Sequence, residues 1–300
     1  MSPRPSLGLD CGAATDVGLV RDHNEDRYWV DPERGAFLVV DGVGGQAAGE
    51  RAAETAVAAI RHCLANPSPN PAAARVCEAI AAANNAIFID ARQHPDLAGM
   101  ACVLTLALVE GIQVTIGHVG DSRLYLISAG AIHKVTSDHS PVGQIEDAGE
   151  IGEEQAMAHP RRNEVFRDVG SSPRAARDSD FVEVCQCDLP ADSAMLLCSD
   201  GLSDHLTSRR IREIAERYTG NSAQIAHALV DAANRAGGRD NITAIFVAGP
   251  EFRGRAGVTR PRLGITRARI RRGLLRSRVA FVTYGALLAM LLWTVLKVRG

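Results

Sequence analysis

The sequence is poor in several features that would define its class at once. Only 4% of its 300 residues are aromatic, so a buried core has to be built mainly from Ala, Val, Leu and Ile. Seven cysteines occur without a C-x-x-C pair, which argues against a zinc ribbon, a redox dithiol or a disulfide scaffold. The first residues lack the apolar run of a secretory signal, so we expect a cytoplasmic protein with reduced thiols. The shares of apolar (46%) and charged (23%) residues exclude a wholly disordered chain.

Acidic residues are absent after residue 252. Residues 1–252 contain 35 acidic and 21 basic residues, a net charge of −14, whereas residues 253–300 carry the other 12 basic residues, a net charge of +12. A body this acidic repels phosphate groups, so we expect no nucleic-acid partner.

The basic segment adjoins an apolar one. Ten arginines lie within residues 253–278, and the eighteen residues 279–296 carry no charge. As a helix these would span about 27 Å, roughly the hydrocarbon core of a bilayer. The basic flank fits the positive-inside rule and contact with anionic lipid; a buried core helix and a nucleic-acid tail are the alternatives. We therefore predict a domain at 1–250, an Arg-rich juxtamembrane linker at 251–278, a transmembrane helix at 279–296 and a short tail at 297–300, with the domain on the cytoplasmic side of the inner membrane.

The first 250 residues show both strand-like and helix-like patterns. Apolar and β-branched runs predict strands at 28–30, 36–40, 102–109, 113–119, 123–127, 181–184, 195–198 and 242–247. Turns at 110–111 and 129–130 join successive strands at hairpin distance, which indicates antiparallel pairing. Apolar spacing of three and four predicts helices at 48–64, 71–92, 208–217 and 222–234. The pattern favours an α+β or sandwich fold over a doubly wound parallel sheet.

Acidic residues gather where the predicted strands begin or end. They are Asp41 before Gly42, Asp121 after a glycine, Asp200 before a glycine, Asp240 before the last strand, and Glu25 with Asp26. For any one of them a turn or cap role is the alternative. Clustered carboxylates become stable when divalent cations lie between them, and oxygen ligands suit Mg²⁺ or Mn²⁺. The pattern predicts a two-metal hydrolytic centre in which an activated water attacks phosphorus.

Two other motifs offer competing interpretations. Residues 42–47, Gly-Val-Gly-Gly-Gln-Ala, fit a dinucleotide-binding fingerprint, but the next predicted elements are a loop and a second helix instead of a parallel strand. Residues 137–140, Ser-Asp-His-Ser, contain the side chains of a hydrolase triad, yet neighbours on one strand or loop cannot all face each other. For His139 we expect a loop-stabilising role, and a dinucleotide-dependent oxidoreductase remains an alternative.

Taken in order, these motifs resemble the metal-dependent serine/threonine protein phosphatases of the 2C type (PPM family) in their bacterial form. The resemblance runs from about Cys11 to Val247. It is carried by residues 15–26, 40–50, 117–123, 138–140, 147–163, 198–204 and 238–243. It implies a four-layer α-β-β-α sandwich with two central antiparallel sheets, phosphorylated protein substrates and an opposing serine/threonine kinase.

The resemblance also implies a role for each site residue. Asp41 would bridge two Mn²⁺ or Mg²⁺ ions with help from the Gly42 carbonyl, and Asp200 and Asp240 would hold one of them. Glu25 and Asp26 would act mainly through water on the other ion, and Asp121 with Asp200 would hold a third, weaker ion. Arg21 would clamp the substrate phosphate, and residues 139–170 would form a mobile flap.

One departure from the family pattern concerns proton donation. Val43 stands where many eukaryotic members carry a histidine proposed as general acid, so protonation of the leaving group must come from elsewhere. No carboxylate at a predicted metal position is missing. A non-catalytic regulator with the same fold is the remaining alternative.

Overall fold

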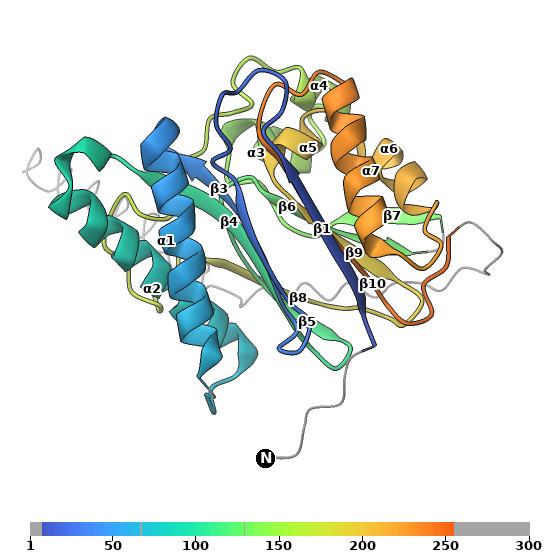
Figure 1. The fold of residues 1–300 in the computed structure, drawn as a ribbon, viewed down its shortest axis with the longest axis horizontal. Coiled ribbons are helices and arrows are strands. Elements are labelled where there is room, and N and C mark those ends of the chain that lie inside the picture. The colour runs from blue at the N-terminus through green and yellow to red at the C-terminus, as the bar shows by residue number, and fades with distance from the viewer. Residues whose placement is uncertain (1–7, 67, 129, 255–300) are drawn as a thin grey trace, which may run out of the picture. The chain divides into compact units, whose positions relative to one another are not determined.

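The computed structural model describes residues 8–254, except 67 and 129 (Figure 1). The predicted linker beyond Gly254, the transmembrane helix at 279–296 and the tail lie outside the described residues. Within them, one helix, Ala72–Gln93, is long and apolar enough to cross a membrane by length and composition alone. Seven of its residues are buried, and six of them, Val76 and Ile80 included, belong to an apolar cluster that it shares with a sheet.

Two antiparallel five-stranded sheets form the centre of the described part (Figure 1). The first has the order β1 (Asp10–Asp16), β10 (Ile242–Ala248), β9 (Ala194–Cys198), β6 (Arg123–Ser128) and β7 (Ala131–Lys134). The second has the order β2 (Arg27–Asp31), β3 (Ala36–Val43), β4 (Ala101–Glu110), β5 (Gln113–Val119) and β8 (Glu183–Asp188). The predicted hairpins are confirmed by the pairs Glu110↔Gln113 and Ser128↔Ala131.

Helices cover the outer face of each sheet. Figure 1 shows α1 (Gln46–Ala65) and α2 (Ala72–Gln93) on one side and α6 (Ser208–Ala215) and α7 (Ser222–Arg235) on the other. Three short helices, α3 (Pro141–Asp147), α4 (Glu153–Met157) and α5 (Asp200–Ser203), lie at the upper end in this view, and a 3₁₀ turn spans Pro95–Leu97. The predicted four-layer α-β-β-α arrangement is confirmed.

Three apolar clusters hold these layers together. Along β3, Phe37 and Val39 belong to the cluster between the sheets, whereas Leu38 and Val40 belong to the cluster under α1 and α2. This alternation follows from the two-residue period of a strand. A third cluster, which includes Phe246, joins the first sheet to α6 and α7. Because both faces of the central strands are buried, these strands show continuous apolar runs in the sequence.

The structure corrects several predictions. Strands β1 and β7 were not among the predicted strands, and β8 begins and ends later than the predicted 181–184. The sequence of β1, Asp-Cys-Gly-Ala-Ala-Thr-Asp, lacks a long apolar run, and its Gly12 packs directly against the backbone of Ser222 and Ala223. The dinucleotide interpretation is wrong, since every strand pair among the described residues is antiparallel and α1 leads into α2.

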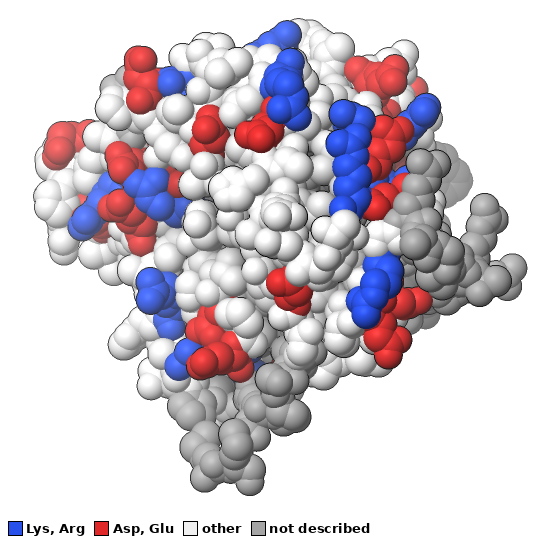
Figure 2. Space-filling model, turned by 45° about the vertical axis from the view of Figure 1, so that its right-hand side comes forward, with Lys and Arg blue, Asp and Glu red and all other residues white. Residues whose placement is uncertain are grey.

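Charged side chains of both signs are interspersed on the surface shown in Figure 2. Many form exposed ion pairs, such as Arg161 with Glu164 and Arg209 with Glu213. Water screens such exposed pairs, so the three apolar clusters dominate the stability of the fold.

Candidate metal centre

The strand register brings the predicted acidic ligands to one edge of the sandwich. Strand β2 begins opposite the end of β3, with Arg27 paired to Val40, so Asp26 lies beside Asp41. In the other sheet the end of β9 meets the start of β10, with Cys198 paired to Ala244. Asp200 follows β9, Asp240 precedes β10, and Asp121 follows β5 at the same edge.

Two polar side chains lock the loops of this edge together. The Ser199 hydroxyl donates to Asp26 Oδ2 (2.7 Å) and accepts from the Thr243 backbone N–H (3.0 Å), which joins the two sheets. The Asn241 carboxamide oxygen accepts from the Glu25 N–H (2.8 Å). Its Nδ2 donates to the backbone carbonyls of Val17 (2.9 Å) and His23 (2.8 Å) in the loop between β1 and β2. The acidic side chains therefore extend from a fixed backbone.

Electrostatic repulsion shows that the carboxylates share one site. Burial, followed by the charges of Asp26, Asp200 and Asp121, raises the pKa of Asp41 well above its ordinary range. Burial, followed by the charges of Asp121, Asp204 and Asp240, also raises the pKa of Asp200. Burial is the main cause for Asp26 and Asp121 too, and it raises their pKa to about 6 and about 7. Without a cation these groups oppose one another's ionisation.

The oxygen atoms of the cluster fit hard divalent cations. Asp26 Oδ1 and Asp200 Oδ1 are buried, and neither has a hydrogen-bond partner, which is costly for a carboxylate unless a cation satisfies it. Among the residues that the structure describes, no three His, Cys, Asp or Glu side chains form a complete metal site on their own. A site of single carboxylates, the Gly42 carbonyl and water is consistent with both observations, because Mg²⁺ and Mn²⁺ retain water ligands.

Close approach of α1 to β3 depends on two glycines. A Cβ on Gly42 would overlap the Gly49 carbonyl, and a Cβ on Gly49 would overlap the Glu25 carboxylate. Gly49 thus makes room for Glu25 against the first turns of α1. The motif at 40–50 included Gly49, but sequence reasoning assigned it no role.

Arg21 lies at the solvent side of the cluster. Its Nη2 is 2.7 Å from Asp240 Oδ2, and half of its side chain is exposed. Five N–H donors in a planar fork leave capacity for the oxygens of a phosphate group. The structure therefore places Arg21 and Asp240, which sequence reasoning assigned to phosphate and metal, in direct contact.

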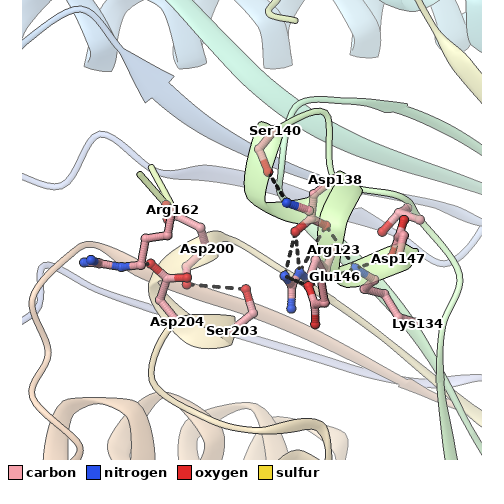
Figure 3. Close-up of polar contacts among 12 residues, drawn as sticks. Arg123, Lys134, Asp138, Ser140, Glu146, Asp147, Arg162, Asp200, Ser203 and Asp204 are labelled. Carbon is pink, nitrogen blue, oxygen red and sulfur yellow. Dashed lines mark hydrogen bonds and ion pairs between the residues drawn. The ribbon is translucent and has the colours of Figure 1, made fainter. Parts of the chain in front are cut away.

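A buried ion-pair network supports the flap beside the site (Figure 3). Arg123 binds Asp138 through Nε (3.0 Å) and Nη2 (2.6 Å) and reaches Glu146 at 3.1 Å. Burial alone would raise the pKa of Asp138, but Arg123 and Lys134 outweigh it and hold the pKa below its usual value. These residues face one another in Figure 3, which also shows a second, separate group of four side chains.

The second group, Arg162, Asp200, Ser203 and Asp204, includes one predicted ligand of the candidate metal centre, Asp200. Arg162 of the flap contacts Asp204 at 2.7 Å (Nε to Oδ2), and the Ser203 hydroxyl lies 3.4 Å from the Asp200 carbonyl (Figure 3). A small cavity lined by both groups also touches Asp121. The flap thus borders the site through charged side chains.

The hydrolase-triad alternative is wrong. Asp138 binds Arg123, the Ser140 hydroxyl caps α3 by accepting from the Gly143 N–H (2.9 Å), and His139 Nδ1 accepts from the Gly120 N–H (3.0 Å). The three side chains have separate partners. The predicted loop-stabilising role of His139 is confirmed.

Sequence reasoning missed two supporting residues, Ser199 and Asn241. Each directly neighbours a predicted ligand, which was the available signal. Nothing in a sequence pattern, however, shows that the Ser199 hydroxyl points toward Asp26 across the two sheets.

Comparison with known proteins agrees with this geometry. Residues 19–233 match the protein family described as Protein phosphatase 2C. The chain belongs to this family. The resemblance of its motifs to the 2C-type phosphatases is therefore confirmed, and the family now accounts for most of the described residues.

Two bacterial relatives align with this chain over different shares of their own length. The serine/threonine protein phosphatase PstP of Mycobacterium tuberculosis is 36% identical over 244 residues, which are 81% of this chain but 45% of the relative. The chain thus spans less than half the length of PstP. The serine/threonine phosphatase stp of Listeria monocytogenes is 34% identical over 240 residues, 78% of this chain and 93% of the relative.

Solved structures in the family share the fold. The crystal structure of the M. tuberculosis phosphatase PstP/Ppp superimposes with a TM-score of 0.72 at 33% identity and covers 80% of this chain and 98% of the other. A structure of the PstP catalytic domain in complex with two manganese ions gives a TM-score of 0.70 at 32% identity and covers 80% and 97%.

Proposed function

We propose that the chain hydrolyses phosphoserine and phosphothreonine on proteins, with two Mn²⁺ or Mg²⁺ ions as cofactors. The proposal rests mainly on the cluster of buried carboxylates, in which neighbouring charges raise the pKa of Asp41 and Asp200. In this cluster Asp26 Oδ1 and Asp200 Oδ1 have no hydrogen-bond partner. The family, its named serine/threonine phosphatases and the manganese-bound PstP structure support the same reaction and metal.

Each acidic residue has a place in this proposal. Asp41 and the Gly42 carbonyl would bridge the two ions, with Asp200 and Asp240 on one of them. Glu25 and Asp26 would bind the water ligands of the other, and Asp121 with Asp200 would hold a third, weaker ion. When bound, such a pair of ions supplies an activated water and stabilises charge on the phosphate.

Arg21 and Val43 define how the substrate meets the chain. Arg21 would exchange its contact with Asp240 for the phosphate oxygens, which a guanidinium binds in pairs. Val43 is 41% exposed and carries no proton to donate, so the leaving group must take its proton from another donor.

A phosphatase assay on the full-length chain tests the proposal. We expect Mn²⁺-dependent hydrolysis of p-nitrophenyl phosphate and of phosphoserine and phosphothreonine peptides, reversed by a chelator. Mn²⁺ binding without turnover would instead support the non-catalytic regulator.

The C-terminal segment carries a second part of the proposal. The ten arginines of 253–278 and the uncharged stretch 279–296 support tethering to the inner membrane, with the basic linker against anionic lipid. Tethering would raise the local concentration near membrane-anchored substrates and the opposing kinase. Deletion of 279–300 should release the protein from the membrane fraction; a full-length chain that is already soluble contradicts the tether.

A further inference from the structure

We propose that His139 is a positioning residue for the Asp121 loop, residues 120–122 between β5 and β6. It holds this loop and connects it to the end of the flap (139–170), and so sets how tightly Asp121 binds the weakest divalent cation. The inference rests on the proposed function for the nature of the ion. Its contacts stand on the structure alone.

His139 binds both backbone groups of one residue. Its N–H donates to the Gly120 carbonyl (2.7 Å), and its Nδ1 accepts from the Gly120 N–H (3.0 Å). Because a single rigid ring and its own backbone make both bonds, they fix the residue immediately before Asp121. Both partners are buried, where a lost hydrogen bond is costly.

The opposite side of Gly120 is also closed. Its φ of +106° favours glycine, and a Cβ there would overlap the Val103 side chain. Val103 pairs in register with Asp41. The loop is thus wedged between His139 and the strand that lies beside the bridging ligand, and it has little room to shift without His139.

The flap meets the same histidine from its other end. The His139 carbonyl accepts from the Phe166 N–H (2.9 Å), and the two rings lie 6.1 Å apart. His139 Nε2 is 3.0 Å from Arg167 Nη1 and 3.3 Å from Glu183 Oε2. One residue therefore connects segment 164–167 to the backbone of the Asp121 loop.

A second attachment holds the other end of the flap, at Val169. Val169 exchanges two backbone hydrogen bonds with Cys102, at 2.8 and 2.9 Å, and Cys102 pairs in register with Gly42. The flap is thus anchored to β4 where it ends and to the Asp121 loop where it begins. A displacement of segment 164–167 is transmitted to Asp121 through His139.

The two ring nitrogens allow a matched pair of variants. The Gly120 N–H makes Nδ1 an acceptor, whereas Nε2 faces Arg167 and Glu183. In His139→Asn the amide oxygen can take the Nδ1 position and keep the bond to Gly120. In His139→Gln the amide reaches toward Nε2, and the Gly120 N–H loses its partner.

Mn²⁺ titration followed by electron paramagnetic resonance of the free ion tests the proposal without turnover. We expect His139→Gln in the full-length chain to weaken the weakest Mn²⁺ site about 10-fold, which corresponds to one lost hydrogen bond. His139→Asn should retain the wild-type affinity, as should the control His133→Gln on an exposed position of β7. In the double variant with Asp121→Asn, His139→Gln should cause no further loss, because both changes act on the same ligand.

Hydrogen exchange separates positioning from general stability. We expect faster amide exchange at 118–123 and 164–168 in His139→Gln. A variant that melts earlier but keeps wild-type Mn²⁺ affinity and exchange at these segments overturns the proposal.

Wild-type protein supplies a measurement that needs no folded His139 variant. Filling the weakest site with Mn²⁺ should slow exchange at 164–168 in the wild type but not in Asp121→Asn, and equal exchange in the two overturns the proposal. A wild-type chain that binds no Mn²⁺ contradicts the proposed function itself, whereas unchanged binding in His139→Gln contradicts this inference alone.

Discussion

At the scale of single residues, the candidate site consists of buried carboxylates whose ionisation is unfavourable until a cation binds. The Ser199 hydroxyl donates to the Asp26 carboxylate, and the Asn241 carboxamide accepts from the Glu25 backbone N–H. Burial and neighbouring carboxylates raise the pKa of Asp41 and of Asp200. The sequence predicted these acids because each follows or precedes an apolar run. It did not predict the roles of Ser199 and Asn241, because the sequence does not show whether a hydroxyl or carboxamide side chain faces solvent or a metal ligand.

Arg21 provides a test of phosphate binding. Arg21→Met should lower kcat/KM for a phosphothreonine peptide by roughly 10- to 100-fold, the value of a charge-assisted hydrogen bond of about 1.5–3 kcal/mol. Steady-state kinetics measure this. Arg51→Met is the matched control, since Arg51 of α1 is equally exposed and pairs at 2.8 Å with Asp90 of α2, which is not a predicted site residue. Equal losses in the two variants would contradict the assigned role.

His118 predicts a pH dependence of stability. Burial, with His139 nearby, lowers the pKa of His118 to about 4, and its Nδ1 lies 2.9 Å from Thr105 Oγ1. The unfolded histidine has the ordinary value near 6.5, so the stability due to the neutral ring is complete above about pH 6.5 and is lost as pH falls toward 4. The loss amounts to roughly 3 kcal/mol.

Urea unfolding at pH 7 and pH 4.5 checks the His118 prediction. We expect His118→Asn to lose less free energy of unfolding over this interval than the wild type, since Asn does not titrate. A wild type and variant with parallel pH profiles would rule out His118 as the source.

At the scale of elements, close packing of α1 on β3 opposes ordinary helix propensity. Gly49→Ala would gain about 1 kcal/mol from propensity in an open helix. Because its Cβ would overlap the Glu25 carboxylate, we expect lower stability and weaker Mn²⁺ binding instead. Denaturant unfolding and metal titration measure the two effects. Ala58→Gly, at an exposed position of α1, should lower stability alone, and a more stable Gly49→Ala would refute the packing argument.

Strong periodicity decided which elements the sequence could predict. The long helices α1, α2 and α7 and the apolar strands β3, β4 and β10 have a dominant pattern, and their predicted bounds fall within a few residues of the observed ones. Strand β1 and the short helices α3, α4 and α5 lack such a pattern. The packing of Gly12 against α7 is a tertiary contact, and α3 begins at a local cap in which Ser140 accepts from the Gly143 N–H.

At the scale of the whole molecule, the candidate site needs both sheets, because each supplies part of the acidic cluster. Asp41 and Asp26 come from the second sheet, and Asp200 and Asp240 from the first. The α+β class and the sandwich were predictable from hairpins and buried runs. The convergence of the acids needed strand order, which local patterns do not contain and which the family resemblance supplied.

The number of Mn²⁺ ions bound by the wild type and by Asp41→Asn tests the central claim most directly. Equilibrium dialysis of the full-length chain should find at least two ions on the wild type. Because one shared carboxylate would position both ions in the proposed site, the variant should lose tight binding of both, together with at least about 100-fold in phosphatase rate. An Asp41→Asn chain that binds as many ions as the wild type, with similar affinity, would contradict the account.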